Sequence, residues 1–235
     1  MSVTYEYPRP SLTVDVVVFG LDEGILKVLL IKRARPGTVF EGCWALPGGF
    51  VDENEDLEVA ARRELREETQ AEPRYIEQLA TFGRPGRDPR GHVVSVAYMA
   101  LSQCNAMTIL GGDDAGEACW WPVKDLAANA VPLAFDHLEI LNVAIKRLRA
   151  KVRWHPVGID LLPLTFPLSD LQKVYETILD RKLDKRNFRR KMLSYGVLVE
   201  AASVRVGNLG RSCALYRFDQ NAYNALLERG SYFEV

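Results

Sequence analysis

The chain has 235 residues, of which 48% are hydrophobic, so it is long enough for one large domain or two modest ones. Its four cysteines lack CxxC spacing and its three histidines lie far apart, which argues against a zinc site and a disulfide framework. This cysteine usage fits a reducing cytoplasm. We expect no signal peptide, because the first residues lack an apolar core, and no membrane span, because the longest apolar runs have strand length.

Charge is unevenly distributed, although the net charge is only −1. Residues 151–235 contain 14 Lys or Arg and 9 Asp or Glu, whereas the preceding residues contain 16 and 22. A basic half and an acidic half indicate two modules with different partners.

The chain begins with two predicted strands. Thr13–Phe19 is rich in β-branched residues, and Leu26–Ile31 returns as its hairpin partner after a turn at Asp22–Gly24. Trp44, which follows, is expected in the core rather than as a stacking platform for a base.

A helix is predicted over Asp56–Thr69, which contains no Gly or Pro, with Asp52 or Asn54 as its N-cap. Three glutamates at i, i+3 and i+4 share one face of this helix: Glu64, Glu67 and Glu68. They repel each other unless a cation lies among them or unless water and neighbouring arginines screen them. Carboxylate ligands favour Mg²⁺, Mn²⁺ or Ca²⁺ over zinc.

The spacing of these residues resembles the Nudix box, the loop–helix–loop that binds metal in Nudix hydrolases. The positions that match are Gly49, Glu55, Arg63, Glu64, Leu65, Glu67 and Glu68. One position departs, because Gln70 stands where the family has a glycine. A left-handed helix end at Gln70 costs roughly 1–2 kcal/mol, unless the helix ends differently.

The resemblance implies an α/β fold, a Nudix α/β/α sandwich with a mixed sheet, over residues 1–152. It also implies a magnesium or manganese site held by Glu64, Glu67 and Glu68, with Arg63 orienting these glutamates and Glu55 steadying the loop. The substrate-binding candidates are Arg33, Gly48, Gly49, Arg87 and Arg90. The general base is not readable from the sequence.

Further elements complete this module. Tyr75–Thr81 and His92–Leu101 are predicted strands, and Phe135–Val152 is a predicted helix with an apolar stripe. The loop Phe82–Gly91 carries three arginines and is either a solvated turn or a cationic rim for a diphosphate. Gly111–Glu117 is a predicted acidic loop whose Glu117 is either solvated or a further metal ligand or base.

The remainder is predicted as a linker, residues 153–167, followed by a winged helix-turn-helix domain, residues 168–235. Its predicted elements are a helix from Ser169, a second helix over Lys185–Tyr195 capped by Asp184, strands Val197–Val206 and Cys213–Phe218, and a terminal helix Asp219–Arg229.

DNA binding is predicted because Arg181–Lys191 contains seven basic residues and one acid, and phosphates attract such a surface. The alternative is a solvated helix in a small interaction domain. The DNA-binding candidates are Lys185, Arg186, Asn187, Arg189, Arg190, Lys191 and Arg211.

Together the two modules resemble the NrtR-type regulators of bacterial NAD metabolism. The stretches that match are GRDPRGHVVSVAYMAL, LAFDHLEIL and LQKVYETILDRKLDKRNFRRKML. The resemblance implies a Nudix domain that binds ADP-ribose or a related nucleotide, and a homodimer that binds double-stranded operator DNA.

Members of that family differ in whether the box still catalyses. Because the box glutamates are intact, we expect Mg²⁺-dependent hydrolysis of ADP-ribose to AMP and ribose 5-phosphate. The alternatives are a repressor with slow or absent turnover, a plain Nudix ADP-ribose pyrophosphatase, and a sugar-responsive regulator of the same architecture.

Overall fold

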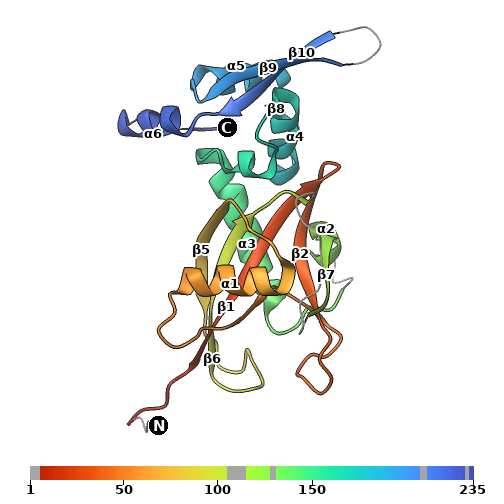
Figure 1. Cartoon of the computed structure of the whole chain (residues 1–235), viewed down its shortest axis with the longest axis vertical. Coiled ribbons are helices and arrows are strands. Elements are labelled where there is room, and N and C mark those ends of the chain that lie inside the picture. Colours follow the sequence, from red (N-terminus) through yellow and green to blue (C-terminus); the bar gives the residue numbers. More distant parts are fainter. Residues whose placement is uncertain (1–5, 105–114, 128–130, 207–210, 231–232) are drawn as a thin grey trace. The chain divides into compact units, whose positions relative to one another are not determined.

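The computed structural model describes residues 6–104, 115–127, 131–206, 211–230 and 233–235. It divides into two compact units, one formed by Met1–Asp22 with Lys27–Ile145 and the other by Lys146–Val235 with Glu23–Leu26 (Figure 1). The division falls inside a single helix, α3, which spans His137–Trp154. The chain therefore passes from the first unit to the second without leaving helical structure.

The first unit is built on a mixed sheet. Its strands are β1 (Ser11–Asp22), β2 (Ile25–Arg33), β3 (Trp44–Ala45), β4 (Gly48–Phe50), β5 (Tyr75–Phe82), β6 (Val93–Leu101) and β7 (Ala115–Pro122). The order is β3-β2-β1-β6-β5, with β4 paired to β1 and β7 paired to β2. β1 runs parallel to β6, from Ser11 beside Val93 to Phe19 beside Leu101, whereas the pairings β1–β4, β2–β7 and β5–β6 are antiparallel.

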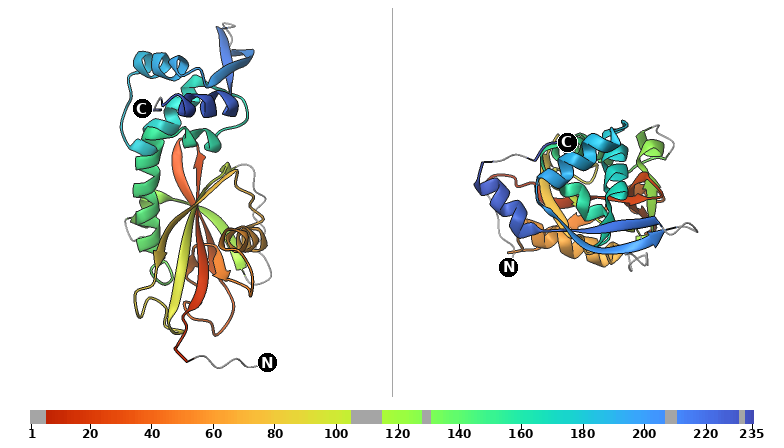
Figure 2. Two further views of the ribbon diagram at one scale, coloured as in Figure 1. Left: turned by 90° about the vertical axis from the view of Figure 1, so that its left-hand side faces the viewer. Right: turned by 90° about the horizontal axis from the view of Figure 1, so that it is seen from above.

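Helices cover both faces of this sheet. α1 (Leu57–Thr69) lies on one face and the first turns of α3 lie on the other, while the short helix α2 (Val123–Ala127) follows β7 (Figure 2). α1 buries Ala60, Ala61 and Leu65 against the β-branched residues of β1. This is the predicted α/β/α sandwich, and burial of apolar side chains from three layers stabilises it.

The ends of α1 show one wrong prediction and one strained residue. Asp56, rather than Asp52 or Asn54, is the N-cap, since its side chain accepts a hydrogen bond from the N–H of Glu58. Asn54 instead adopts a left-handed conformation in the preceding turn, with φ of 65°. At the other end Gln70 is left-handed, with φ of 57°, and its N–H donates to the Arg66 carbonyl. The helix thus ends as the family's glycine would end it, but with a side chain present.

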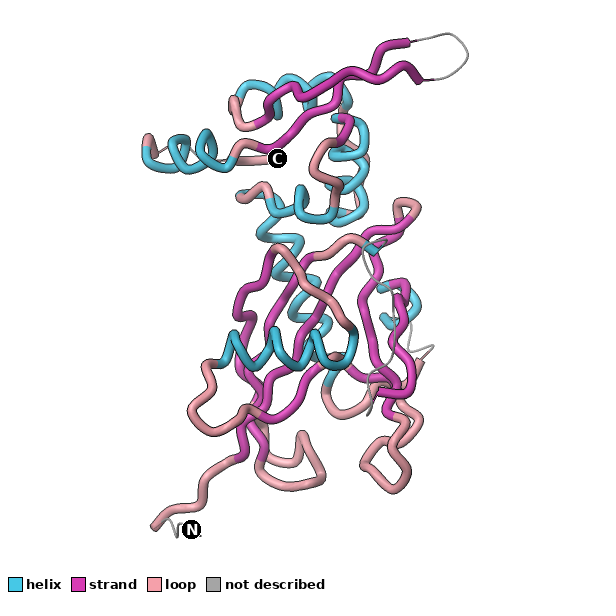
Figure 3. Tube along the Cα trace, viewed as in Figure 1, coloured by secondary structure: helices cyan, strands magenta, loops and turns pink. Residues whose placement is uncertain are grey.

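The second unit has the winged-helix arrangement. Its elements are η2 (Val157–Leu161), β8 (Phe166–Pro167), α4 (Leu168–Leu179), α5 (Lys185–Ser194), β9 (Leu198–Val206), β10 (Arg211–Phe218) and α6 (Gln220–Glu228). Strands β8, β10 and β9 form an antiparallel sheet in that order. Figure 3 shows the β9–β10 hairpin extending past the helices of this unit, as a wing does. The hairpin tip, residues 207–210, lies outside the described residues.

Residues 153–167, predicted as a linker, are structured instead. They hold the 3₁₀ helix η2 and strand β8, in which Phe166 is 1% exposed and pairs with Tyr216 of β10. The apolar side chains of this segment complete the core of the second unit, which explains why it does not behave as a linker. Glu117, predicted in a loop, lies on β7 beside Lys32 of β2, and residues 111–114 of that loop lie outside the described part of the chain.

No helix in the described ranges has both the length and the apolar character needed to span a membrane.

Candidate functional site

Two glycines bring β4 close to β1 and α1. A Cβ on Gly48 would lie 2.1 Å from the carbonyl oxygen of Val14, and a Cβ on Gly49 would lie 2.5 Å from the carboxyl carbon of Glu64. Neither position therefore accepts a side chain without movement of its neighbours. The close approach lets the N–H of Gly48 donate a hydrogen bond to Glu68, at 2.8 Å.

Arg63 is the centre of a carboxylate network. Its Nε and Nη2 donate to the two carboxylate oxygens of Glu55, at 2.7 and 2.8 Å. Its Nη1 donates to Glu64 at 2.7 Å and to Glu67 at 3.3 Å, and Nη2 also donates to the Phe50 carbonyl. The bidentate pairing with Arg63 lowers the pKa of Glu55 to about 2. One guanidinium thus fixes the loop, strand β4 and two glutamates of α1 together.

The three glutamates have different surroundings. Burial raises the pKa of Glu68 to about 8, and burial also raises the pKa of Glu64, in both cases against the effect of their hydrogen bonds. The Glu67 side chain is 60% exposed. Glu64 and Glu68 are therefore carboxylates whose ionised form lacks sufficient compensation from the protein.

This donor set fits a hard divalent cation, which would favour the ionised forms of Glu64 and Glu68. The described residues contain no group of three His, Cys, Asp or Glu side chains close enough to hold a metal ion. Glu64 and Glu67 both accept hydrogen bonds from Arg63 Nη1, so metal binding by all three glutamates would require these bonds to be exchanged.

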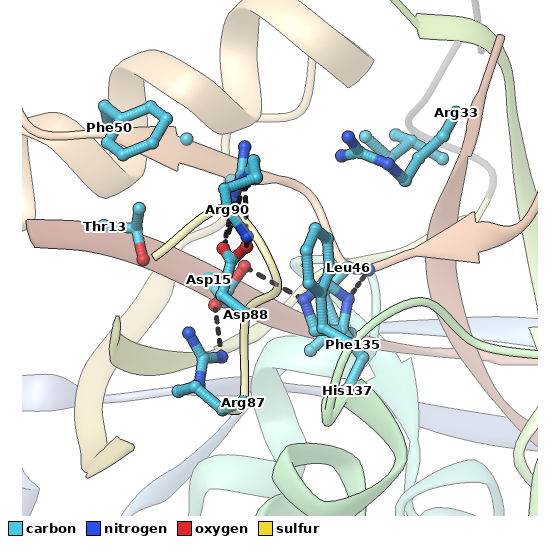
Figure 4. A pocket seen from close by; sticks show the side chains of 13 residues that line it. Thr13, Asp15, Arg33, Leu46, Phe50, Arg87, Asp88, Arg90, Phe135 and His137 are labelled. Atoms are coloured by element: carbon cyan, nitrogen blue, oxygen red, sulfur yellow. Dashed lines mark hydrogen bonds and ion pairs between the residues drawn. The ribbon is translucent and has the colours of Figure 1, made fainter. Parts of the chain in front are cut away.

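Gly48 and Gly49 line a pocket, whose other side chains are drawn in Figure 4. It is bordered by strands β1, β2 and β4, by the loop between β5 and β6, and by the start of α3. Its lining residues are Thr13, Asp15, Ile31, Arg33, Leu46, Gly48, Gly49, Phe50, Arg87, Asp88, Arg90, Phe135 and His137. The five predicted substrate-binding residues come from three separate segments of sequence, and the fold gathers all five here.

Arg33 and Arg90 bring positive charge to this pocket. The Arg90 guanidinium lies 5.1 Å from the ring centroids of both Phe50 and Phe135, and it pairs with Asp88 at 2.6 Å. The Arg33 guanidinium also lies 5.1 Å from Phe135, and burial, followed by repulsion from Arg90, lowers its pKa. Two cations held over aromatic rings are a suitable environment for phosphate oxygens.

Arg87 differs from the expectation of an open cationic rim. Its guanidinium donates two hydrogen bonds to Asp136, at 2.8 and 2.6 Å, and its side chain is 3% exposed. Because its side chain is buried as well as paired, whereas that of Arg90 is 37% exposed, Arg87 holds the loop to the residue that precedes α3. Its contribution to the pocket is structural support.

Six of the seven candidate DNA-binding residues lie on α5. Asp184 caps the helix as predicted, accepting a hydrogen bond from the Asn187 N–H at 2.8 Å, and Phe188 and Met192 are buried beneath it. The opposite side exposes Lys185, Arg186, Asn187, Arg189 and Arg190, with Lys191 partly exposed. Arg211 begins β10, and its side chain is outside the described part of the chain.

Comparison with known proteins identifies both units. The family model of the NUDIX domain matches residues 9–142, and that of the NrtR DNA-binding winged helix domain matches residues 158–218. The chain is 38% identical over 221 residues to the ADPR responsive transcriptional repressor NtrR of Acinetobacter baylyi, covering 93% of this chain and 86% of that protein. The chain belongs to the NrtR family.

Solved structures agree with this assignment. NrtR of Shewanella oneidensis, crystallised with a 27mer DNA, superposes with a TM-score of 0.79 at 37% identity, covering 91% of this chain and 95% of that one. The Nudix domain of the same protein, crystallised with ADP ribose, matches with a TM-score of 0.55 at 43% identity, covering 60% and 90% of the two chains. The chain is also 40% identical over 136 residues to the ADP-ribose pyrophosphatase of Methanocaldococcus jannaschii, covering 58% of this chain and 73% of that enzyme.

Sequence reasoning missed a buried polar group beneath the pocket of this NrtR family member. Asp15, on β1, accepts a hydrogen bond from the Ser95 hydroxyl and lies 3.4 Å from His137 Nε2 and 3.7 Å from Arg87 Nη2. His137 Nδ1 in turn accepts from the N–H of Leu46, at 2.8 Å. One signal was available, since an aspartate inside an otherwise apolar strand must find partners when it is buried.

Proposed function

We propose that the chain is a transcriptional repressor whose Nudix domain binds ADP-ribose and whose winged helix binds operator DNA. The observation that carries this proposal is the presence, in one chain, of a pocket lined by Arg33 and Arg90 and of an exposed basic helix, α5. An enzyme without a regulatory role has no use for the second feature. The similarity to an ADPR responsive repressor supports ADP-ribose as the effector.

In the Nudix domain, Arg33 and Arg90 bind the diphosphate of the ligand. Both guanidinium groups are held in place by aromatic rings and acceptors of the protein, so little side-chain entropy is lost when they bind phosphate. Gly48 and Gly49 leave room for the ligand to approach the backbone beside α1.

The second part of the proposal is that the Nudix domain also hydrolyses ADP-ribose. A water oxygen attacks one phosphorus of the diphosphate and the bridging P–O bond breaks, which gives AMP and ribose 5-phosphate. Glu64, Glu67 and Glu68 would hold Mg²⁺ or Mn²⁺, which neutralises phosphate oxygens and lowers the pKa of bound water. For Glu67 this requires exchange of its hydrogen bond with Arg63, while Glu55 keeps Arg63 in place.

In the second domain, α5 enters the major groove of DNA and the β9–β10 hairpin follows the backbone. Arg189 and Arg190 supply phosphate or base contacts from the exposed side of α5. The DNA-binding form is a homodimer in the cytoplasm, acting on genes of NAD metabolism. ADP-ribose regulates it by binding more tightly to one spacing of the two winged helices than to the other.

A gel shift with DNA from upstream of the neighbouring genes, run beside an assay for AMP release with Mg²⁺, tests the proposal. ADP-ribose, NAD, ribose 5-phosphate and arabinose are compared as effectors. The proposal expects a specific shift that ADP-ribose changes. Hydrolysis without any DNA binding would identify a plain pyrophosphatase, and a response to arabinose alone would identify a sugar-responsive regulator.

A Glu67→Gln, Glu68→Gln double variant separates the two activities. It removes negative charge from the metal site and leaves α5 untouched, so hydrolysis should be lost while DNA binding without effector remains. Hydrolysis that persists in this variant contradicts the assignment of the metal ligands.

A further inference from the structure

Residues Phe233–Val235, which we name the strut, connect the end of α3 to the end of the recognition helix α5. Phe233 is 1% exposed and packs on the ring of Tyr195, the residue after α5, with ring centroids 4.8 Å apart. The Tyr195 hydroxyl donates to the Glu234 carbonyl at 2.7 Å and accepts from the Glu234 N–H at 3.0 Å. The strut is therefore fixed to α5 by both packing and hydrogen bonds.

Two more contacts extend the strut in both directions. Lys191, within α5, lies 3.6 Å from the carboxylate of Glu234. The N–H of Val235 donates to the carbonyl of Arg153, in the last turn of α3, at 2.9 Å. The carbonyls of a last helical turn lack partners inside the helix, so an N–H from the strut satisfies one of them.

The other end of α5 is also connected to α3, by a different route. Arg149 of α3 donates to the Ile178 carbonyl, near the end of α4, at 3.1 Å. Glu176 of α4 then accepts hydrogen bonds from the Leu183 N–H and from Lys182, both at 3.0 Å, and so fixes the turn that leads into α5. The recognition helix is thus held at its start and at its end by groups that contact α3.

α3 is the element through which ligand binding can reach these contacts. Its first residue, His137, lines the ligand pocket, and the preceding Asp136 pairs with Arg87. Its last turns belong to the second unit. A helix transmits displacement along its axis because its backbone hydrogen bonds keep it rigid, and the strut is a short, multiply bonded link at its far end.

We propose that the strut positions α5 for DNA and couples it to the ligand pocket through α3. The inference rests on the proposed function, since it concerns how an effector in the Nudix domain changes DNA binding. Tyr195, Phe233 and the N–H of Val235 are positioning groups that do not themselves touch DNA. Their role predicts an effect on the coupling between the two ligands, beyond any effect on stability.

Four variants of the full chain test each end of the strut. Val235→Pro removes the N–H that donates to Arg153, and Val235→Ala is its control because it keeps that N–H. Tyr195→Phe removes the hydroxyl that binds Glu234 but keeps the ring against Phe233. Tyr223→Phe is its control, because it also removes a tyrosine hydroxyl, one that bonds His155 and not a residue of the strut.

The measured quantity is the ratio of DNA dissociation constants with and without saturating ADP-ribose, together with the ADP-ribose affinity of the free protein and its melting temperature. In Val235→Pro and Tyr195→Phe, ADP-ribose should change DNA affinity by a factor roughly three- to tenfold smaller than in wild type. This is the effect of losing one hydrogen bond. Their ADP-ribose affinity should stay unchanged, and both controls should keep the wild-type ratio.

A wild-type ratio in Val235→Pro and Tyr195→Phe would overturn the proposal, and so would an equal loss in all four variants. If wild type itself gives a ratio of one, ADP-ribose does not regulate DNA binding, and the proposed function falls together with the strut. The variants therefore test the proposed role of the strut, and the wild-type protein tests the proposed function. If Val235→Pro does not fold, Tyr195→Phe, which keeps its ring packing, decides the result.

Discussion

The Glu68 carboxylate accepts a hydrogen bond from the backbone N–H of Gly48, 2.8 Å away, and this bond joins the glutamate-bearing face of α1 to the first residue of β4. Glu68 is nevertheless too deeply buried for this single donor to compensate its charge, which is why its pKa rises to about 8. The same burial makes the ionised form of Glu68 costly, so the cation proposed above would stabilise its carboxylate.

The first prediction concerns stability against pH in the absence of divalent metal. A carboxyl whose pKa is raised in the folded state holds its proton more tightly there, so its contribution is fully present below its ordinary pKa of 4.5 and is lost as pH rises through about 8. Wild type in EDTA should therefore lose on the order of 1–3 kcal/mol of unfolding free energy between pH 5 and pH 9 relative to Glu68→Gln.

Urea unfolding at several pH values measures this difference, and added Mg²⁺ should restore stability to wild type only. Parallel pH profiles for wild type and Glu68→Gln, with no selective effect of Mg²⁺, would show that Glu68 is not a buried, metal-responsive carboxyl.

The second prediction concerns Arg63, which bonds Glu55 through two nitrogens and also reaches Glu64. Arg63→Lys keeps the charge but cannot make the bidentate pair, so ADP-ribose hydrolysis should fall by about tenfold or more. Arg62→Lys is the matched control, because Arg62 bonds Glu58 and the Pro73 carbonyl, neither of which is a candidate site residue. Equal hydrolysis rates in Arg63→Lys and Arg62→Lys would show that the bidentate pair of Arg63 is not needed for hydrolysis.

The third prediction concerns DNA. Arg189→Ala with Arg190→Ala should weaken binding across all sequences and lower the slope of log affinity against log salt by about two, if each arginine neutralises one phosphate. Arg66→Ala, which removes a similar exposed arginine from the first unit, serves as the control. An unchanged salt slope would indicate that this side of α5 contacts protein instead.

The fourth prediction concerns Gln70, whose φ of 57° lies in the left-handed region. Gln70→Gly should raise the unfolding free energy by about 1 kcal/mol, because glycine adopts this conformation without the Cβ clash. Gln70→Ala retains the Cβ and should give no such gain. The measurement is the denaturant concentration at half-unfolding, compared between variants whose unfolding free energy has the same dependence on denaturant. Equal midpoints for Gln70→Gly and Gln70→Ala would mean that Gln70 is unstrained.

Local signals predicted much of the molecule. The cap at Asp184 was predicted correctly, because it depends on residues close in sequence. The helix end at Gln70 was left open between a left-handed end and another ending, and the structure shows the left-handed one. The pairing of Arg63 with Glu55 was not predicted. The prediction of Asp52 or Asn54 as N-cap was wrong, because Asp56, a neighbouring residue of the same chemistry, caps the helix instead.

Long-range pairing set the limit of prediction. Arg87 was predicted to bind phosphate because it lies in a loop with three arginines. Its partner Asp136 lies 49 positions away in sequence, and only the fold brings the two together. Asp15 and Ser95 meet across 80 positions because β1 and β6 pair in parallel. The segment 153–167 looks like a linker by its prolines, and only its packing against β10 shows otherwise.

The most direct test of the whole account is the affinity of the intact chain for its operator, measured by fluorescence anisotropy while ADP-ribose is increased. We predict a change in the DNA dissociation constant that saturates with ADP-ribose, and the same factor in the ADP-ribose dissociation constant when DNA is added, since coupling between two ligands is reciprocal. A DNA affinity that stays constant up to saturating ADP-ribose would contradict the account.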